Sequence, residues 1–212
     1  RFGEAEFAAY FLATLVVRML TGAWVGWELT FEIRQGTLAM RLLKPVHPFF
    51  VFAVENVAAL PMRALVALPI AIAALLWVGA GQLASDWANW IVAPVAIALA
   101  WLITFAAMAL IGTLAFFWES SLSIFSVWMG FYFVFAGYTI PLELLPDWLW
   151  AAARWSPFRF LLSFPVEVML GLVEGGAMWS GLAVQAAWVL AFAAAAQATW
   201  RAGLRRYAAY GG

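Results

Sequence analysis

The sequence predicts an all-α integral membrane protein. Hydrophobic residues make up 67% of its 212 residues, whereas a soluble globular chain is only about half apolar. The mean hydropathy is +0.95, and long runs such as IVAPVAIALAWLITFAAMALIGTLAFF show no alternation of apolar and polar residues. A membrane β-barrel requires that alternation, so a bundle of transmembrane helices is the expected fold.

The sequence predicts a single transmembrane domain over residues 1–212, with five membrane spans. A bilayer crossing needs roughly 20 mostly apolar residues. The expected spans are residues 6–27, 49–79, 87–117, 124–140 and 178–200. The second is longer than one crossing needs, so we expect it to tilt, to kink at Pro61 or Pro69, or to extend past the membrane.

The distribution of basic residues predicts the orientation. It favours a cytoplasmic position for the polar 28–48 segment, the break at residues 118–123 and the C-terminal tail. The basic residues on that side are Arg34, Arg41, Lys44, Arg201, Arg205 and Arg206, against Arg1, Arg154 and Arg159 on the other. The first residue then lies outside, so we expect another span before it and six spans in the intact protein.

The composition and the motifs argue against several classes of function. The formal net charge is zero, which gives no pull toward nucleic acid. Cysteine is absent and His47 is the only histidine, so we expect no metal site, and no nucleophile–base set indicates a catalytic centre. The only lysine, Lys44, lies between Leu43 and Pro45, which excludes a G-x-x-x-x-G-K-[ST] phosphate loop.

The stretch ELTFEIRQGTLAMRLLKPVHP concentrates charge near the start of an otherwise apolar chain. Apolar residues are interspersed with the charges, so an amphipathic helix at the membrane surface is expected, ending before Pro45. Two interpretations remain open. The helix either anchors the connection at the interface or docks on a cytoplasmic partner.

Charged residues at membrane depth are costly and usually functional. Arg18 lies within the first span, and Glu55 and Arg63 lie within the second. Arg18 and Glu55 fall at similar depth on consecutive antiparallel spans, which predicts an ion pair, either structural or in a transport path. An alternative function follows: a secondary transporter or channel that uses Arg18, Glu55 and Arg63 as an ion relay.

Residues 141–177 are too broken by proline for a simple span and too apolar for an ordinary loop. We expect interfacial or re-entrant helices there, on the outer side, with Glu167 facing water near an outer gate. The candidate gate residues are Pro141, Leu142, Pro146, Trp148, Pro157, Phe158 and Pro165. Aromatic runs such as WMGFYFVF suit either lipid-facing surfaces or a path for a hydrophobic or cationic compound.

Three motifs, in order, carry a resemblance to a known family. EIRQGTLAMRLLKPVHP resembles the I-x-x-G-x-L-x-x-x-L-L-x-P segment of type-2 ABC exporter permeases, between their second and third spans. GYTIPLELLPDWLWAAARWSPFRFLLSFPVEVMLG resembles the segment before their last span. LRRYAAYGG resembles the basic tail of the daunorubicin- and viologen-exporter subgroup.

The resemblance implies a multi-pass permease in a bacterial cytoplasmic membrane that exports hydrophobic compounds or drugs. Two permease subunits, identical or different, would form the path in the lipid and work with two copies of a separate ATPase subunit. That partner would bind ATP and Mg; this chain is expected to bind no cofactor. The 28–48 segment would be the coupling helix seated on the ATPase. The residues implied at that contact are Glu32, Arg34, Gly36, Leu38, Leu42, Leu43 and Pro45. A membrane-embedded lipid enzyme is a weaker alternative, because no catalytic cluster is visible.

Overall fold

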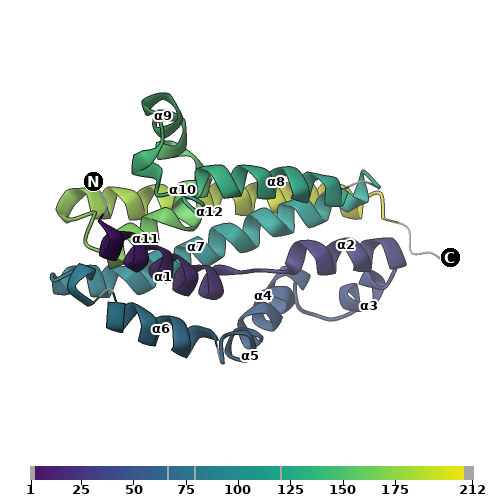
Figure 1. Ribbon diagram of the computed structural model, residues 1–212. Coiled ribbons are helices and arrows are strands. Elements are labelled where there is room, and N and C mark those ends of the chain that lie inside the picture. The colour runs from purple at the N-terminus through teal and green to yellow at the C-terminus, as the bar shows by residue number, and fades with distance from the viewer. Residues whose placement is uncertain (1–2, 66, 79, 120, 208–212) are drawn as a thin grey trace.

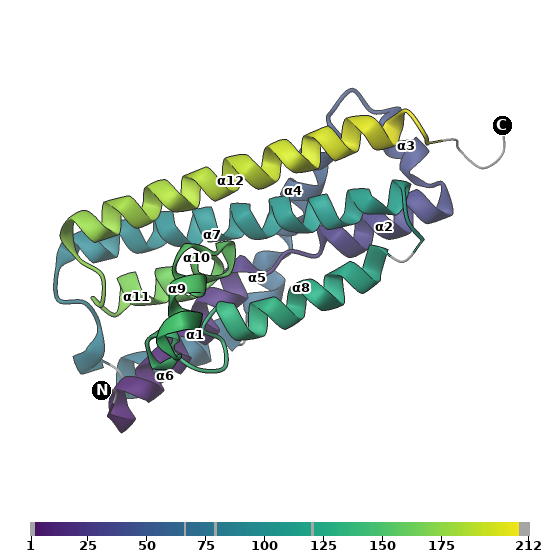
Figure 2. The same ribbon diagram turned by 90° about the horizontal axis from the view of Figure 1, so that it is seen from above.

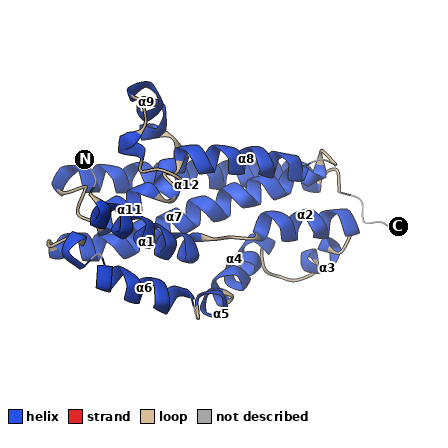
Figure 3. Cartoon of the chain, in the orientation of Figure 1, coloured by secondary structure: helices blue, strands red, loops and turns tan. Residues whose placement is uncertain are grey.

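The described part of the chain is helical, which confirms the predicted fold class. The computed structural model describes residues 3–65, 67–78, 80–119 and 121–207, with the side chains of all of these residues except Arg63, Ala67, Ala80 and Leu122. Within these ranges no segment forms a β-strand (Figure 3). Three stretches there are long and apolar enough to cross a membrane: Glu4–Gln35, Trp87–Phe116 and Gly175–Leu204. Shorter apolar helices cover Pro48–Met62, Leu68–Val78 and Ser123–Phe135.

The first predicted span is broken. α1 (Glu4–Thr21) ends at Gly22, which has an extended backbone, and α2 (Val25–Gln35) begins three residues later. The first free N–H of α2, on Trp24, donates to the side-chain oxygen of Asn56 at 2.9 Å. This bond satisfies a donor that no helical carbonyl reaches, so it stabilises the break. The helix then continues past residue 27, where the span was expected to end, into the polar segment.

The second predicted span is also divided, and both prolines begin a new helix. α4 (Pro48–Ala58) is followed by α5 (Leu60–Ala64) and α6 (Ala67–Val78). Pro61 lies in the first turn of α5 and Pro69 in the first turn of α6. Proline is tolerated in a first turn because its missing N–H would have no helical partner there. The short helix η1 (Ala80–Gln82) leads on to α7.

α7 (Trp87–Thr113) is the central helix of the bundle. It packs along α12 (Gly175–Leu204) and also contacts α1, α2 and α11 (Figure 2). Gly26 and Gly112 let α2 approach closely, because a Cβ on Gly26 would lie 2.9 Å from the carbonyl oxygen of Met108. The helix continues into η2 (Leu114–Phe116). A turn then leads to α8 (Ser121–Phe135). This helix overlaps the predicted span 124–140, but it starts three residues earlier and stops five residues earlier.

Short helices join α8 to α12. They are η3 (Leu142–Leu144), α9 (Asp147–Trp155), α10 (Pro157–Leu161) and α11 (Ser163–Met169). α9 projects from the bundle, nearly across the direction of the long helices (Figure 1). α11 packs against α1 and α7, and all seven of its residues are buried. This segment therefore folds back into the bundle instead of forming a surface loop.

The 28–48 segment, the α7–α8 turn and the end of α12 lie at the same end of the bundle (Figure 1). Trp200 of α12 packs its ring 5.7 Å from Phe116 and 5.9 Å from His47, centroid to centroid. The Arg206 guanidinium lies 5.2 Å from the ring of Phe117. The start of α1 and the α11–α12 connection lie at the opposite end.

Candidate functional site

The 28–48 segment folds as two helices with a tight turn between them. α2 ends at Gly36, whose φ of 75° is the left-handed conformation that favours glycine. α3 (Leu38–Leu42) follows after a single residue and ends before Pro45. His47 then accepts a hydrogen bond from the backbone N–H of Phe49 at 3.2 Å, which caps the start of α4.

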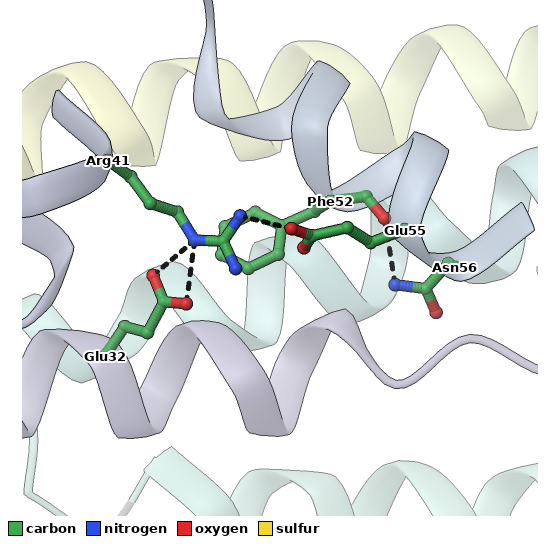
Figure 4. Close-up of polar contacts among 5 residues, drawn as sticks. All are labelled: Glu32, Arg41, Phe52, Glu55 and Asn56. Carbon is green, nitrogen blue, oxygen red and sulfur yellow. Dashed lines mark hydrogen bonds and ion pairs between the residues drawn. The ribbon is translucent and has the colours of Figure 1, made fainter. Parts of the chain in front are cut away.

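A single arginine joins three helices of this region. Arg41 of α3 donates from Nε to both carboxylate oxygens of Glu32 on α2, each at 2.8 Å. Its Nη1 donates to Glu55 Oε1 on α4 at 2.9 Å (Figure 4). The guanidinium carbon lies 4.2 Å from the centroid of the buried Phe52 ring. Two carboxylates and an aromatic face thus hold the planar group in one position.

The electrostatics of this cluster keep the arginine charged. Burial alone lowers the pKa of Arg41, but its hydrogen bonds and charge interactions with Glu55 and Glu32 outweigh burial and raise that pKa. The Arg41 and Glu32 side chains are 19% and 20% exposed, and that of Glu55 is 48% exposed. The Glu32 contact is therefore the better shielded of the two, and the Glu55 contact is open to solvent screening.

The residues around Arg41 divide into an inner and an outer set. Leu38 is fully buried, so it fixes α3 against the bundle and is not available to a partner. Leu43 is 80% exposed, Met40 is 68% exposed, and Leu42 lies at the edge of the same surface. We call Met40, Leu42 and Leu43 the apolar tip. Of the other residues predicted for this surface, Arg34 and Pro45 are exposed, Gly36 forms the turn, and Glu32 is held by Arg41.

The predicted ion pair between Arg18 and Glu55 is wrong. Arg18 donates to the hydroxyl of Tyr138, and its guanidinium lies 4.6 Å from the centroid of that ring. Glu55 instead pairs with Arg41. The break after Thr21 explains the difference, because the two spans are not the straight antiparallel helices that the depth estimate assumed. The backbone of Arg63 lies in α5, and its side chain is outside the described part of the chain.

A groove of about 390 Å³ lies beside the break between α1 and α2. Its walls come from these two helices, α7 and α8, with one residue from α10. Five of the lining residues are aromatic: Trp24, Trp27, Phe125, Trp128 and Tyr132. Among the described residues that line it, Arg18 alone is charged. We call this cavity the Arg18 groove.

The prediction that Glu167 faces water is also wrong. Glu167 lies in the buried helix α11 and is 5% exposed. Its Oε2 accepts a hydrogen bond from Arg159 Nη2 of α10 at 2.6 Å, and Arg159 also lies 5.2 Å from the Trp150 ring. A buried carboxylate requires such a partner, because an unpaired charge in the interior is very costly.

The seven predicted gate residues do not form one cluster. Leu142 is buried, Pro165 lies inside α11, and Pro157 begins α10. Phe158 packs its ring 4.6 Å from Trp128 of α8, whereas Trp148 on α9 is 71% exposed. Pro141 and Pro146 precede η3 and α9 as their capping residues. Most of these residues therefore shape the helices instead of lining one opening.

Three functional candidates were missed from the sequence: Arg41, Asn56 and Arg159. Arg41 appeared only as one of several basic residues, and Arg159 only as a charge in the outer count. The available signal was a matching carboxylate nearby on the next helix, as for Arg159 and Glu167, eight residues apart. No such signal identifies Asn56, whose partner Trp24 lies 32 residues away.

The comparisons with known proteins agree with this architecture. The sequence matches the family model described as ABC-2 family transporter protein over residues 4–211, nearly the whole chain. A search of curated proteins found no match. The matched region contains the long apolar helices, the 28–48 segment and the helices that precede α12. The chain is therefore a multi-pass membrane protein that belongs to the ABC-2 transporter family.

Proposed function

We propose that this chain is the permease subunit of an ATP-driven exporter and that its 28–48 segment docks on a separate ATPase subunit. The observation that carries the proposal is the apolar tip. Met40 and Leu43 are among the most exposed apolar residues of the described chain. Both belong to α3 or its C-terminal cap, and α3 is fixed by the buried Leu38 and by the bonds of Arg41 to α2 and α4. Exposed apolar groups on a rigid support are suited to a protein cleft.

The connections of the 28–48 segment suit it to transmit movement. α2 is one uninterrupted helix that carries Trp27 at the Arg18 groove and Glu32 at Arg41. A displacement of α3 therefore reaches the groove through α2, and it reaches the next span through the bond from Arg41 to Glu55. The break at residues 22–24 provides a joint about which α2 turns relative to α1.

These connections support a mechanism of alternating access. Closure of the ATPase dimer on ATP and Mg pulls the apolar tip, and α2 and α4 move together because Arg41 holds both. The bundle then switches between an inward-open and an outward-open arrangement, a two-state rocking biased from a distance. The assembly comprises two permease subunits, identical or different, and two ATPase subunits in a bacterial cytoplasmic membrane.

No observation favours the alternative of an ion relay through Arg18, Glu55 and Arg63. Arg18 contacts Tyr138 and Glu55 contacts Arg41, so the two charges belong to separate sites. A relay requires neighbouring groups that exchange protons or ions.

The test is purification of the tagged protein, expressed with its full-length sequence in its own host, in mild detergent. We expect a partner with a phosphate loop to co-purify and to hydrolyse ATP. The double variant Met40→Asp/Leu43→Asp should lose this partner, because two carboxylates would enter the apolar contact. Leu172→Asp is the matched control, since Leu172 is 45% exposed at the opposite end of the bundle.

Two results would count against the proposal. One is a protein that purifies without an ATPase and still transports in vesicles. The other is a double variant that keeps the ATPase while Leu172→Asp loses it, which would place the contact at the wrong end.

A further inference from the structure

Arg18 lies in a candidate membrane span, its side chain is exposed, and it has no ion-pair partner among the described residues. It belongs to the candidate span Glu4–Gln35 and faces the Arg18 groove. The ion pairs in the described part of the chain join Arg41 to Glu32 and Glu55, and Arg159 to Glu167. No ion pair there includes Arg18. A charged side chain in a membrane span is costly, so it indicates a ligand or a path.

Tyr138 positions the guanidinium but does not neutralise it. The phenol hydroxyl accepts one hydrogen bond, and the ring provides an aromatic face at 4.6 Å. A guanidinium carries five N–H donors in a planar fork that matches a carboxylate or a phosphate. One donor is used by Tyr138, so the remaining edge of the fork is available to an anion.

The rest of the groove suits the apolar body of the same ligand. Trp27, Phe125 and Trp128 line it, and its volume of about 390 Å³ falls in the range of small-molecule sites, roughly 300–1,000 Å³. Aromatic faces alone would also attract an organic cation. Here the positive charge of Arg18 lies in the same cavity and repels a cation, which reverses the preference.

We propose that the Arg18 groove binds an amphipathic organic anion. Its carboxylate or phosphate pairs with Arg18, and its aromatic or aliphatic body lies against Trp27 and Trp128. As a binding site this stands on the groove alone. As the site of the exported substrate it rests on the proposed function, and it then assigns anionic amphiphiles as the substrate class.

The test compares three radiolabelled ligands that share one body: 1-pyrenebutyrate, the neutral 1-pyrenebutanol and a pyrenebutyl trimethylammonium. Equilibrium binding is measured to the purified full-length protein in phosphatidylcholine nanodiscs, with binding to empty nanodiscs subtracted. We expect the anion to bind about tenfold or more tighter than the alcohol, as for a charge-assisted hydrogen bond, and the cation to bind weakest. Equal binding of the three, or a preference for the cation, overturns the proposal.

Three variants locate the site. Arg18→Gln should abolish the preference for the anion, and Arg18→Lys should keep part of it, because lysine retains the charge without the fork. Tyr138→Phe removes the hydroxyl but keeps the ring, so anion binding should persist or strengthen. An anion preference that survives Arg18→Gln in full contradicts the assignment. The wild-type comparison remains decisive if Arg18→Gln does not fold.

Nanodiscs that contain phosphatidylglycerol distinguish a lipid from a soluble ligand. Competition by this lipid identifies an anionic headgroup as an occupant, and unchanged binding identifies the free amphiphile; either result supports an anion site. The binding assay uses no ATPase, so it separates this inference from the proposed function. Anion binding without ATP-driven transport leaves the site and removes the exporter role. Transport of the three ligands at equal rates leaves the exporter role and removes the substrate class.

Discussion

Arg41 on α3 and Glu55 on α4 are joined by a hydrogen-bonded ion pair, with Nη1 2.9 Å from Oε1. This contact connects the polar segment of the chain to the next apolar helix. The same arginine holds Glu32 of α2 with its Nε, so one side chain links the elements on both sides of α3. The mechanical role that we propose for the segment depends on this link.

Removal of the Arg41 fork should uncouple ATP hydrolysis from transport. In Arg41→Gln the apolar tip remains, so the ATPase still docks, but α4 no longer follows α3. We expect hydrolysis near the wild-type rate and transport per ATP reduced about tenfold or more, a coupling loss in the usual range of roughly 1–3 kcal/mol. Arg41→Lys should keep part of the coupling, since its point charge reaches one carboxylate at a time.

The control for this prediction is Arg201→Gln, which removes an exposed basic residue at the same end of the bundle. Reconstituted vesicles with the ATPase provide both rates. Wild-type transport per ATP in Arg41→Gln would show that the link carries no movement.

A side chain at Gly26 should push α2 away from α7. Its Cβ would lie 2.9 Å from the backbone oxygen of Met108, which cannot move aside as a side chain does. We expect Gly26→Ala to lower the free energy of unfolding by about 1–3 kcal/mol, as overpacking does. This loss should appear although alanine is a better helix former than glycine by roughly 1 kcal/mol.

Gly130→Ala on α8 is the matched control, because nothing lies within 4 Å of its added Cβ. Unfolding by SDS of the detergent-purified protein measures both. Equal stability of the two variants would mean that α2 and α7 are not in close contact.

Removing one partner of the Arg159–Glu167 ion pair should lower the free energy of unfolding strongly, whereas replacing both partners with apolar residues should lower it little. Glu167→Gln leaves a largely buried guanidinium without its carboxylate, which we expect to cost about 3–5 kcal/mol. The double variant Arg159→Met/Glu167→Leu removes both charges and should recover most of that loss. Unfolding in SDS again measures the change.

Arg154→Gln, on the exposed side of α9, should change stability by no more than about 0.5 kcal/mol. A double variant as unstable as the single one would show that the pair itself, and not the unpaired charge, matters.

The Tyr10 hydroxyl should prevent any side chain at position 137. It donates to the Gly137 carbonyl at 2.9 Å and lies 3.1 Å from Ser163 Oγ. A Cβ at residue 137 would lie 2.5 Å from this hydroxyl, on a backbone with φ of 74°. We expect Gly137→Ala to destabilise strongly, and Tyr10→Phe alone to cost about 1 kcal/mol.

Combined, the two changes should cost less than their sum, because Tyr10→Phe removes the nearest clashing atom. A double-mutant cycle in SDS unfolding tests this coupling. Additive effects would place the clash elsewhere.

The sequence by itself determined the membrane class, the helical fold and the positions of the apolar segments. Hydrophobicity and proline act locally, so a kink at Pro61 or Pro69 was among the outcomes expected from the chain alone; the structure begins a new helix at each of the two prolines. A helix ending before Pro45 was expected in the 28–48 segment for the same reason, but the division into α2 and α3 at Gly36 was not.

Only the tertiary structure decided which charges meet. Arg18 and Glu55 were placed together on the assumption of straight helices, but the break at residues 22–24 separates them. Glu55 pairs with Arg41, and Arg18 donates a hydrogen bond to Tyr138, which lies 120 residues away in the chain. Glu167 was expected to face water because Pro165 opens the backbone beside it, but the structure buries it against Arg159. Pairing of charges depends on how elements distant in sequence pack, and local composition carries no information about that.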